Sequence, residues 1–154
     1  MTNEHSPTSD EAQLRKLLEQ WASAVRAKDS NGFTRNYAPD VLLFDVINQL
    51  QHVGSAGVRK RAEEWVASFE GPIGYEMRDL HITTGGDVAF CHSLNRINAT
   101  RKDGQHVDMW VRATMCFRKR DGTWMVTHEH SSVPFDGESG KAALELKPEQ
   151  VADV

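Results

Sequence analysis

The sequence has few cysteines, no long apolar run and no excess of basic charge, and each shortage argues against a class of protein. Its two cysteines, Cys91 and Cys116, both stand within apolar stretches, so we expect buried free thiols rather than a disulfide framework. The longest apolar run, Val41–Phe44, is too short to cross a bilayer. The net charge of −4, with lysine and arginine scattered along the chain, provides no basic stripe for a nucleic-acid backbone. We therefore expect neither nucleic acid nor a membrane as a partner.

The composition is that of one folded domain. With 154 residues, of which 39% are hydrophobic and 26% charged, the chain can bury one core but is too short for two ordinary domains. We predict a disordered segment at 1–7, a single domain at 8–134 and a loosely ordered tail at 135–154. The first eleven residues are polar and acidic, unlike a secretory or transit peptide, so the expected location is the cytoplasm.

Helical spacing is concentrated in the first half of the chain. Thr8 and Glu11 have the spacing of a capping box, and apolar residues then recur every three or four positions. A segment with Gly and Pro at 70–74 marks the end of the last helix. Helices are expected at 8–27, 33–37 and 56–69, with a strand at 41–46.

The second half of the chain has the pattern of four strands separated by turns rich in Gly and Asp. The strands are expected at 75–83, 88–100, 106–119 and 124–134. Helices followed by an antiparallel meander are typical of an α+β domain. Most of these strands are longer than average and have to curve. We therefore predict an α+β fold in which a strongly curved antiparallel sheet wraps around three N-terminal helices and encloses a pocket.

Three stretches carry a resemblance to a known superfamily: "AKDSNGFTRNYAPDVLLFD" at 27–45, "GSAGVRKRAEEW" at 54–65 and "RKRDGTWMVTHEHSSVP" at 118–134. With the order of elements, they make the chain from Glu11 to Pro134 similar to the nuclear transport factor two-like superfamily. This is the cone-shaped fold of ketosteroid isomerases, scytalone dehydratase and SnoaL-like polyketide cyclases. The third stretch is also similar to the association domain of calcium/calmodulin-dependent kinases. The fold implied is specific, but the superfamily includes enzymes, binding proteins and oligomerisation modules.

The resemblance to ketosteroid isomerase implies a general base at Asp45, which stands nine residues before Gly54 as the catalytic Asp does in that enzyme. The isomerase also has a hydrogen-bonding Tyr and a protonated Asp, whose positions here are taken by Trp21 and Met115. Met has no proton to donate, and the Trp indole is a differently placed donor. We therefore do not expect steroid isomerisation.

The faces of the last two strands depend on the length of the loop around Gly122. A three-residue loop places Met115 opposite Thr127, and a two-residue turn shifts the pairing by one residue and turns His128 and His130 toward the Met115 face. The kinase association domain resembles the arrangement with the three-residue loop, and we therefore favour that loop here. The pocket is then lined by Ser93, Asn95, Met109, Val111, Met115, Thr127, Glu129 and Ser131, and closed by Trp21, Tyr37 and Asp45. The opposite face carries Trp110, Arg112, Trp124, His128 and His130, and the superfamily implies a homodimer through it.

The sequence "HEH" at 128–130 suggests a metal site, but its spacing matches no zinc motif and Arg112 is expected beside His130. We predict no metal and assign the two histidines to the dimer interface. Glu129 is either a second pocket carboxylate or an ion-pair partner of Arg96 or Arg112. Asp45 is either a partly buried base, for which burial would raise the pKa, or a strand-end residue that binds backbone amides.

Three functions follow from these alternatives. The first is a cofactor-independent isomerase, dehydratase or cyclase acting on a small apolar oxygenated substrate, in which Asp45 removes a proton and Asn95 or Tyr37 binds the oxyanion. The second is a non-catalytic homodimer that binds a ligand or acts as a scaffold. The third is a hydrolase in which Asp45 and Glu129 activate water.

Overall fold

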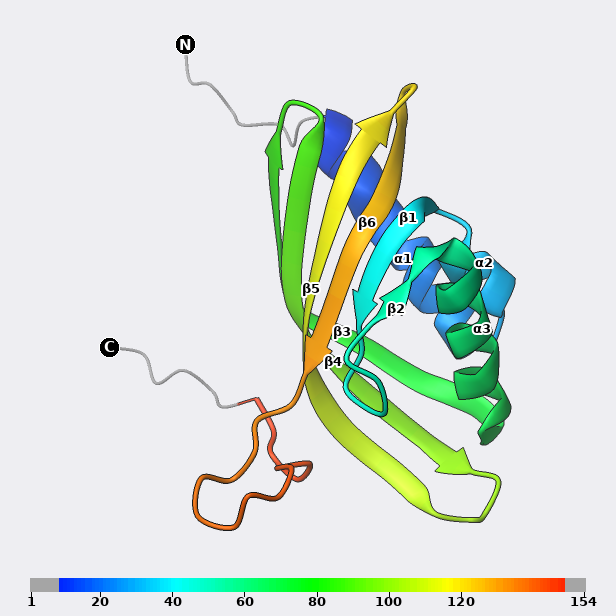
Figure 1. Cartoon of the computed structure of the whole chain (residues 1–154), viewed down its shortest axis with the longest axis vertical. Helices are drawn as coiled ribbons and strands as arrows, with labels where there is room; N and C mark the ends of the chain where they lie inside the picture. Colours follow the sequence, from blue (N-terminus) through cyan, green and yellow to red (C-terminus); the bar gives the residue numbers. More distant parts are fainter. Residues whose placement is uncertain (1–8, 149–154) are drawn as a thin grey trace.

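The computed structural model describes residues 9–148, which form three helices and one six-stranded sheet in the strand order β2-β1-β6-β5-β4-β3. The sheet is curved and open, and the helices cover one of its faces (Figure 1). Neighbouring strands are antiparallel except for β1 and β6, which are parallel. The predicted cone-shaped α+β fold is confirmed. The elements are α1 (Ser9–Arg26), α2 (Ser30–Thr34), β1 (Tyr37–Phe44), β2 (His52–Val53), α3 (Gly54–Ala67), β3 (Phe69–Gly85), β4 (Val88–Arg101), β5 (His106–Arg120) and β6 (Thr123–Ser132).

Helix α1 follows directly from its sequence pattern. The buried side chains Leu14, Leu18, Ala22 and Val25 recur at helical spacing and form one apolar face. Acidic residues occupy the first turn and Arg26 the last, as the helix dipole favours. The predicted range of this helix agrees with the structure to within about one turn. Thr8 and the predicted disordered segment 1–7 lie outside the described residues.

Several element boundaries differ from the predictions. The short helix α2 begins earlier because the Asp29 side chain caps it, accepting a hydrogen bond from the Gly32 amide at 3.0 Å, and Tyr37 starts strand β1 instead of ending a helix. Helix α3 stops at Ala67, and the segment 70–74 is not a closing turn but part of β3, where the pairing register shifts between Glu70 and Gly74.

The core consists of two clusters of buried side chains. The first packs Leu14, Leu18, Val41 and Val58 against Phe117, Trp124 and Val126; the second packs Val25, Phe33, Ala62 and Val66 against Phe69, Ile73 and Tyr75. Trp21 packs against both clusters, since the indole lies at their junction. Its ring meets Tyr75 edge-on at a centroid distance of 5.2 Å.

The last hairpin has the turn that we did not favour. Arg120 pairs with Thr123 across a two-residue turn, in which Asp121 and Gly122 have positive φ angles of 50° and 77°. Such an Asp-Gly turn matches the twist of the two strands. The predicted three-residue loop and the pairing of Met115 with Thr127 are therefore wrong.

A β-bulge at Thr127 then shifts the register by one residue. Phe117 pairs with Val126 but Cys116 pairs with His128, so Thr127 is the extra residue and Met115 pairs with Glu129. Beyond the bulge, Glu129 turns to the helix-covered face after all. Between the turn and the bulge, each side chain of β6 faces the side of the sheet opposite to the one we predicted. Trp124 is therefore buried and does not lie on the outer face.

The described part of the tail, 135–148, continues beyond the sheet without a helix. Phe135 forms an isolated bridge with Ala142, and the Asp136 carboxylate accepts hydrogen bonds from the Glu138 and Ser139 amides. This segment is therefore held by local hydrogen bonds. Within residues 9–148, no helix is both long enough and apolar enough to cross a membrane.

Candidate functional site

A cavity of about 120 Å³ lies between the helices and the concave face of the sheet. Its wall is mainly aromatic and aliphatic, and Asp45, Arg61 and Glu129 are its charged members. Both core clusters contribute to the wall, so the cavity marks their junction. The lining residues are Trp21, Val25, Phe33, Thr34, Tyr37, Leu43, Asp45, Val46, Val58, Arg61, Ala62, Trp65, Tyr75, Ile97, Val111, Glu129 and Ser131.

Six of the residues named from the sequence line this cavity: Trp21, Tyr37, Asp45, Val111, Glu129 and Ser131. Five others do not: Ser93, Asn95, Met109, Met115 and Thr127. Met115 is buried in the first core cluster. Thr127 is the bulged residue, and its hydroxyl donates to the Cys116 carbonyl at 3.3 Å. The structure thus places about half of the predicted set at the cavity and the rest in the surrounding scaffold.

Glu129 is the carboxylate that β6 directs into the cavity. Oε2 of Glu129 accepts a hydrogen bond from the Tyr37 hydroxyl, whose oxygen in turn accepts one from Trp21 Nε1 at 3.2 Å. Burial raises the pKa of Glu129 to about 7, and the charge of Asp45 adds to the increase while the Tyr37 hydrogen bond opposes it. The same burial, together with the negative charge of Glu129, raises the pKa of Tyr37 well above its ordinary value. Near neutral pH, Glu129 is therefore the side chain of this cavity that can both take and give a proton.

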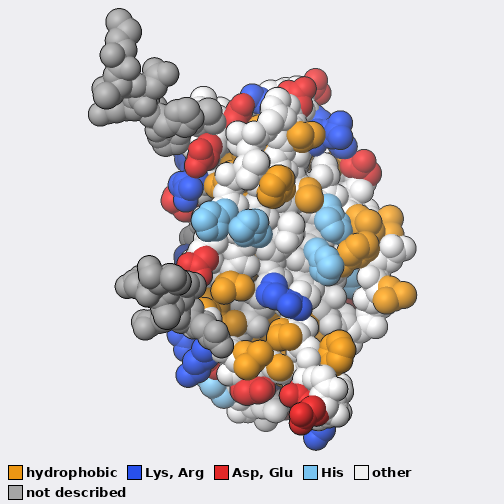
Figure 2. All heavy atoms as spheres, turned by 90° about the vertical axis from the view of Figure 1, so that its left-hand side faces the viewer, with side chains coloured by type: hydrophobic (Ala, Val, Ile, Leu, Met, Phe, Trp, Pro, Cys, Tyr) orange, Lys and Arg blue, Asp and Glu red, His pale blue; other side chains and the backbone are white. Residues whose placement is uncertain are grey.

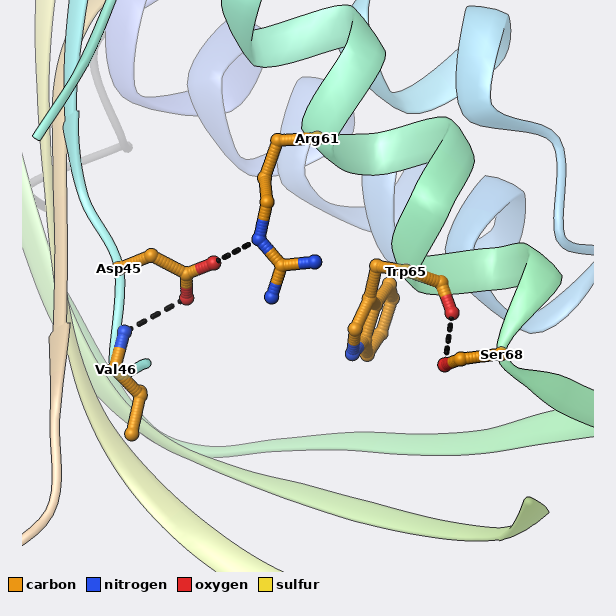
Figure 3. Close-up of polar contacts among 5 residues, drawn as sticks. All are labelled: Asp45, Val46, Arg61, Trp65 and Ser68. Carbon is orange, nitrogen blue, oxygen red and sulfur yellow. Dashed lines mark hydrogen bonds and ion pairs between the residues drawn. The ribbon is translucent and has the colours of Figure 1, made fainter. Parts of the chain in front are cut away.

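Asp45 follows strand β1 and forms an ion pair with helix α3 (Figure 3). Arg61 Nε donates to Asp45 Oδ2 at 2.7 Å, and the Val46 amide donates to Asp45 Oδ1 at 2.8 Å. The bond from the Val46 amide is the contact expected if Asp45 were a strand-end residue, and the same side chain also lines the cavity. Asp45 is thus held in place by Arg61 and the Val46 amide.

Sequence reasoning missed Arg61, although a signal was available. Val58, Ala62 and Trp65 recur at helical spacing along α3, and Arg61 lies beside them on the same side. A partly buried Asp45 also needs a cationic partner. The Arg61 side chain is only 12% exposed. The Ser68 hydroxyl closes the end of this helix by donating to the Trp65 carbonyl at 2.6 Å.

Tyr75 was also missed by sequence reasoning. The predicted residues Ser93 and Asn95 do not line the cavity but form a hydrogen-bonded chain that ends at the Tyr75 hydroxyl. Ser93 Oγ donates to Asn95 Oδ1 at 2.8 Å, and Asn95 Nδ2 donates to the Tyr75 hydroxyl oxygen at 2.8 Å. Burial, with the charge of Glu129, raises the pKa of Tyr75 above its usual range, so the phenol stays protonated. Because Asn95 donates to its oxygen, the Tyr75 O–H remains available as a donor.

The predicted interface residues fall on two sides of the sheet. Trp124 lies in the core at 3% exposure, and its Nε1 donates to Asp10 Oδ1 at 3.3 Å, so its assignment to the outer face is corrected. On the outer face, the rings of His128 and His130 contact Phe44 at centroid distances of 4.9 and 5.4 Å. Trp110 and Arg112 belong to the same face by strand alternation.

Neither arginine proposed as a partner of Glu129 forms that ion pair. Arg96 pairs with Asp108 at 2.8 Å, and Arg112 Nε donates to Ser132 Oγ at 3.1 Å. In the part of the chain that the structure describes, no group of three or more His, Cys, Asp or Glu side chains is placed to hold a metal ion. The chemistry that the cavity offers is therefore that of two carboxylates, an arginine and two phenols.

Solved structures with this fold come from several bacteria. A nuclear transport factor two-like protein of unknown function from Pseudomonas putida KT2440 is 38% identical, with a TM-score of 0.83, and the match covers 92% of this chain and 98% of that one. A protein from Xanthomonas campestris, provisionally named a calcium/calmodulin-dependent protein kinase II association domain, is 21% identical (TM-score 0.67, 77% and 84% covered). A ketosteroid isomerase-like protein from Erwinia carotovora atroseptica is 18% identical (TM-score 0.70, 81% and 96% covered). The last two show likeness of fold alone.

A search of curated proteins found no match. The model of the SnoaL-like domain matches residues 14–136, which include α1 from Leu14 onward, α2, α3, the whole sheet and every residue that lines the cavity. The chain therefore belongs to the SnoaL-like domain family of the nuclear transport factor two-like superfamily.

Proposed function

We propose that this protein is a cofactor-independent enzyme that transfers a proton within a small, largely apolar, oxygenated substrate, with Glu129 as the acid-base group. The observation that carries the proposal is the position of Glu129 in the wall of an aromatic cavity with a pKa of about 7. A group with a pKa near the working pH is populated in both protonation states, which is what general acid-base catalysis requires.

The contacts of Glu129 leave one oxygen available for chemistry. Tyr37 donates to Oε2, and Oε1 has no hydrogen-bond partner recorded among residues 9–148. Tyr37 thus holds the carboxyl group in one orientation while the second oxygen can meet a ligand. Trp21 steadies the Tyr37 hydroxyl in turn.

The reaction class follows from these groups. Glu129 Oε1 removes a proton from a carbon next to a carbonyl group, and the C–H electron pair moves onto the carbonyl oxygen to give an enolate. The Tyr75 O–H can donate to that oxygen, a role that we had expected of Asn95 or Tyr37. The same proton then returns to another carbon, giving isomerisation, or to a leaving hydroxyl group, giving dehydration. Asp45 serves in this scheme as the partner of Arg61, and its charge acts on Glu129.

A proton-abstraction probe tests the scheme without knowledge of the natural substrate. The base-promoted ring opening of 5-nitrobenzisoxazole breaks one C–H and one N–O bond and releases a coloured phenolate. We expect the wild type to accelerate it, with a rate that rises through about pH 7 as Glu129 ionises. Glu129→Gln should lower that rate by about 10²-fold or more.

The matched control is Glu138→Gln, which changes an exposed carboxylate in the tail and should leave the rate unchanged. Equal rates for the wild type and Glu129→Gln would contradict the proposal. A wild type that leaves the solution rate unchanged at pH 9, where Glu129 is ionised, would contradict it as well.

A second candidate function, a homodimeric ligand-binding or scaffolding domain, is favoured by the outer face of the sheet. Figure 2 shows apolar and histidine side chains gathered there around a basic one. Val88 and Phe90 on this face are 49% and 45% exposed, and Phe44 and Trp110 lie on the same side. Exposed apolar side chains in such number favour a partner. Light scattering on the wild type and Phe44→Glu tests the dimer, and a wild type that is monomeric at high concentration would reject it.

A further inference from the structure

The cavity has more hydrogen-bond donors than acceptors. The Asp45 carboxylate is occupied by Arg61 and the Val46 amide, and Glu129 Oε2 is occupied by Tyr37, which leaves Glu129 Oε1 as the free carboxylate oxygen of the cavity. On the donor side, the Tyr75 O–H and both Nη atoms of Arg61 have no acceptor recorded within residues 9–148. A ligand that suits these free donors carries hydrogen-bond acceptors.

Arg61 provides the free donors as a fork. Asp45 is bonded through Nε alone, so the two Nη atoms at the end of the guanidinium are left for another group. Figure 3 shows this end of Arg61 pointing away from helix α3, with Asp45 on one side and the Trp65 ring on the other. The Nη atoms are not sealed off by protein, because no buried unpartnered atom of Arg61 is found in the described chain. Because Arg61 lines the cavity, a ligand there can meet these atoms.

From this arrangement we propose that the cavity binds a small planar aromatic carboxylate, whose two oxygens are held by the Nη1 and Nη2 atoms of Arg61. The proposal goes beyond the proposed function, because it names a ligand of the same cavity and does not require that ligand to be the substrate. A carboxylate accepts hydrogen bonds through both oxygens and matches the planar fork of a guanidinium. An ammonium or alcohol ligand would not use two parallel donors in this way.

The rest of the wall determines the shape and size of the ligand. Trp21, Phe33, Trp65 and Tyr75 supply aromatic surfaces. The cavity volume of about 120 Å³ suits a single ring, since an engineered apolar cavity of roughly 150 Å³ in another protein binds benzene. The ligand is therefore a monocyclic aromatic acid rather than a steroid-sized molecule.

The ion pair with Asp45 controls the strength of this interaction. Arg61 is shared between Asp45 and the ligand, so the negative charge of Asp45 weakens the attraction for a second carboxylate. Removing the Asp45 charge should therefore strengthen ligand binding, while removing the Arg61 charge should weaken it. If the pair served the fold alone, disrupting it from either side would affect binding in the same direction.

The test measures binding of benzoate and of its neutral analogue benzamide to the full chain, by calorimetry and by quenching of tryptophan fluorescence. We expect the wild type to prefer benzoate, and Arg61→Gln to lower benzoate affinity by about tenfold or more with little effect on benzamide. Asp45→Asn, which keeps an acceptor for the Val46 amide, should raise benzoate affinity. The control Arg59→Gln changes an exposed arginine on the same helix and should have no effect.

Several outcomes would overturn the proposal: equal binding of benzoate and benzamide to the wild type, no binding of either, or an unchanged preference in Arg61→Gln. Weaker benzoate binding in Asp45→Asn would also overturn it. Thermal unfolding of each variant shows whether it is folded. If Arg61→Gln does not fold, the double variant Asp45→Asn/Arg61→Gln takes its place in the binding measurement. The outcome is separate from that of the proposed function, because Glu129→Gln should still bind benzoate even if Glu129 transfers no proton.

Discussion

The hydroxyl of Tyr37 donates a hydrogen bond to Oε2 of Glu129, joining residues that are 92 positions apart in the sequence. The contact exists because β1 and β6 are parallel neighbours, with Leu43 paired to Glu129. It lowers the pKa of a carboxyl group that burial raises, and so helps to set the value near 7. The proton-transfer chemistry proposed for the cavity therefore depends on the pairing of two strands from opposite ends of the domain.

Replacing Tyr37 by Phe should raise the pKa of Glu129. The lost hydrogen bond favours the charged carboxylate, so without it the protonated form persists to higher pH. The titration can be followed by infrared difference spectroscopy of the carboxyl group, with Glu129→Gln identifying its band. Tyr75→Phe is the control, since Tyr75 makes no hydrogen bond to Glu129 and should leave the pKa in place. A lower pKa in Tyr37→Phe would contradict the assignment.

Glu129→Gln should be more stable than the wild type above pH 7 but not below pH 4. The pKa of Glu129 is raised on folding from 4.5 to about 7, so folding favours its protonated form. This contribution is fully present below the unfolded pKa and is lost as the pH rises through 7. The difference in free energy of unfolding at pH 8 should be roughly 1–3 kcal/mol. Urea denaturation at pH 4 and pH 8 measures it, and a difference that is the same at both pH values would contradict the raised pKa.

Trp124→Ala should destabilise the protein far more than Trp110→Ala. Trp124 is 3% exposed and packs in the core, whereas Trp110 lies on the outer face. Truncating a buried aromatic side chain costs about 3–5 kcal/mol, and the outer-face substitution should cost roughly 1 kcal/mol or less. Chemical denaturation of both variants at low protein concentration gives the comparison. Similar losses for the two would argue against the strand phase that the bulge creates.

Benzoate affinity should fall as the pH rises through 7 in the wild type and stay flat in Glu129→Gln. Four charged or titratable groups surround the carboxyl of Glu129. They are Tyr37 at the start of β1, Asp45 directly after β1, Arg61 on α3 and Tyr75 on β3. Both tyrosines stay protonated, because their pKa values are raised. Ionised Glu129 would therefore place an additional negative charge in the cavity and oppose an anionic ligand. Titrations at pH 6 and pH 8, with benzamide as the uncharged control, measure the effect.

Much of the fold could be predicted from local sequence patterns. The spacing of Leu14, Leu18 and Val25 indicates an amphipathic helix, and alternation with Gly-containing turns indicates the long strands, because both signals depend on neighbours within a few residues. The identity of the superfamily followed from the same order of elements together with three short stretches. Asp45 and Glu129 were named as cavity residues, and both line the cavity.

The reason given for Glu129, however, was wrong. The sequence was interpreted with a three-residue loop and an unbroken strand, whereas the protein has a two-residue turn and a bulge at Thr127. Each difference shifts the strand by one residue, and together they leave Glu129 on the inner face but move Trp124 into the core. A bulge has no local signature here, because it is a feature of the pairing between β5 and β6 and not of the residue spacing within β6.

The sequence by itself determined the helices, the long strands and the family, since these depend on residue type and short-range spacing. Only the tertiary structure decided which groups meet: Tyr37 with Glu129, Asn95 with Tyr75, and Asp45 with Arg61. These contacts join residues 16 to 92 positions apart. Their partners are chosen by strand order, register and the position of helix α3 over the sheet, and none of these is encoded in a local pattern.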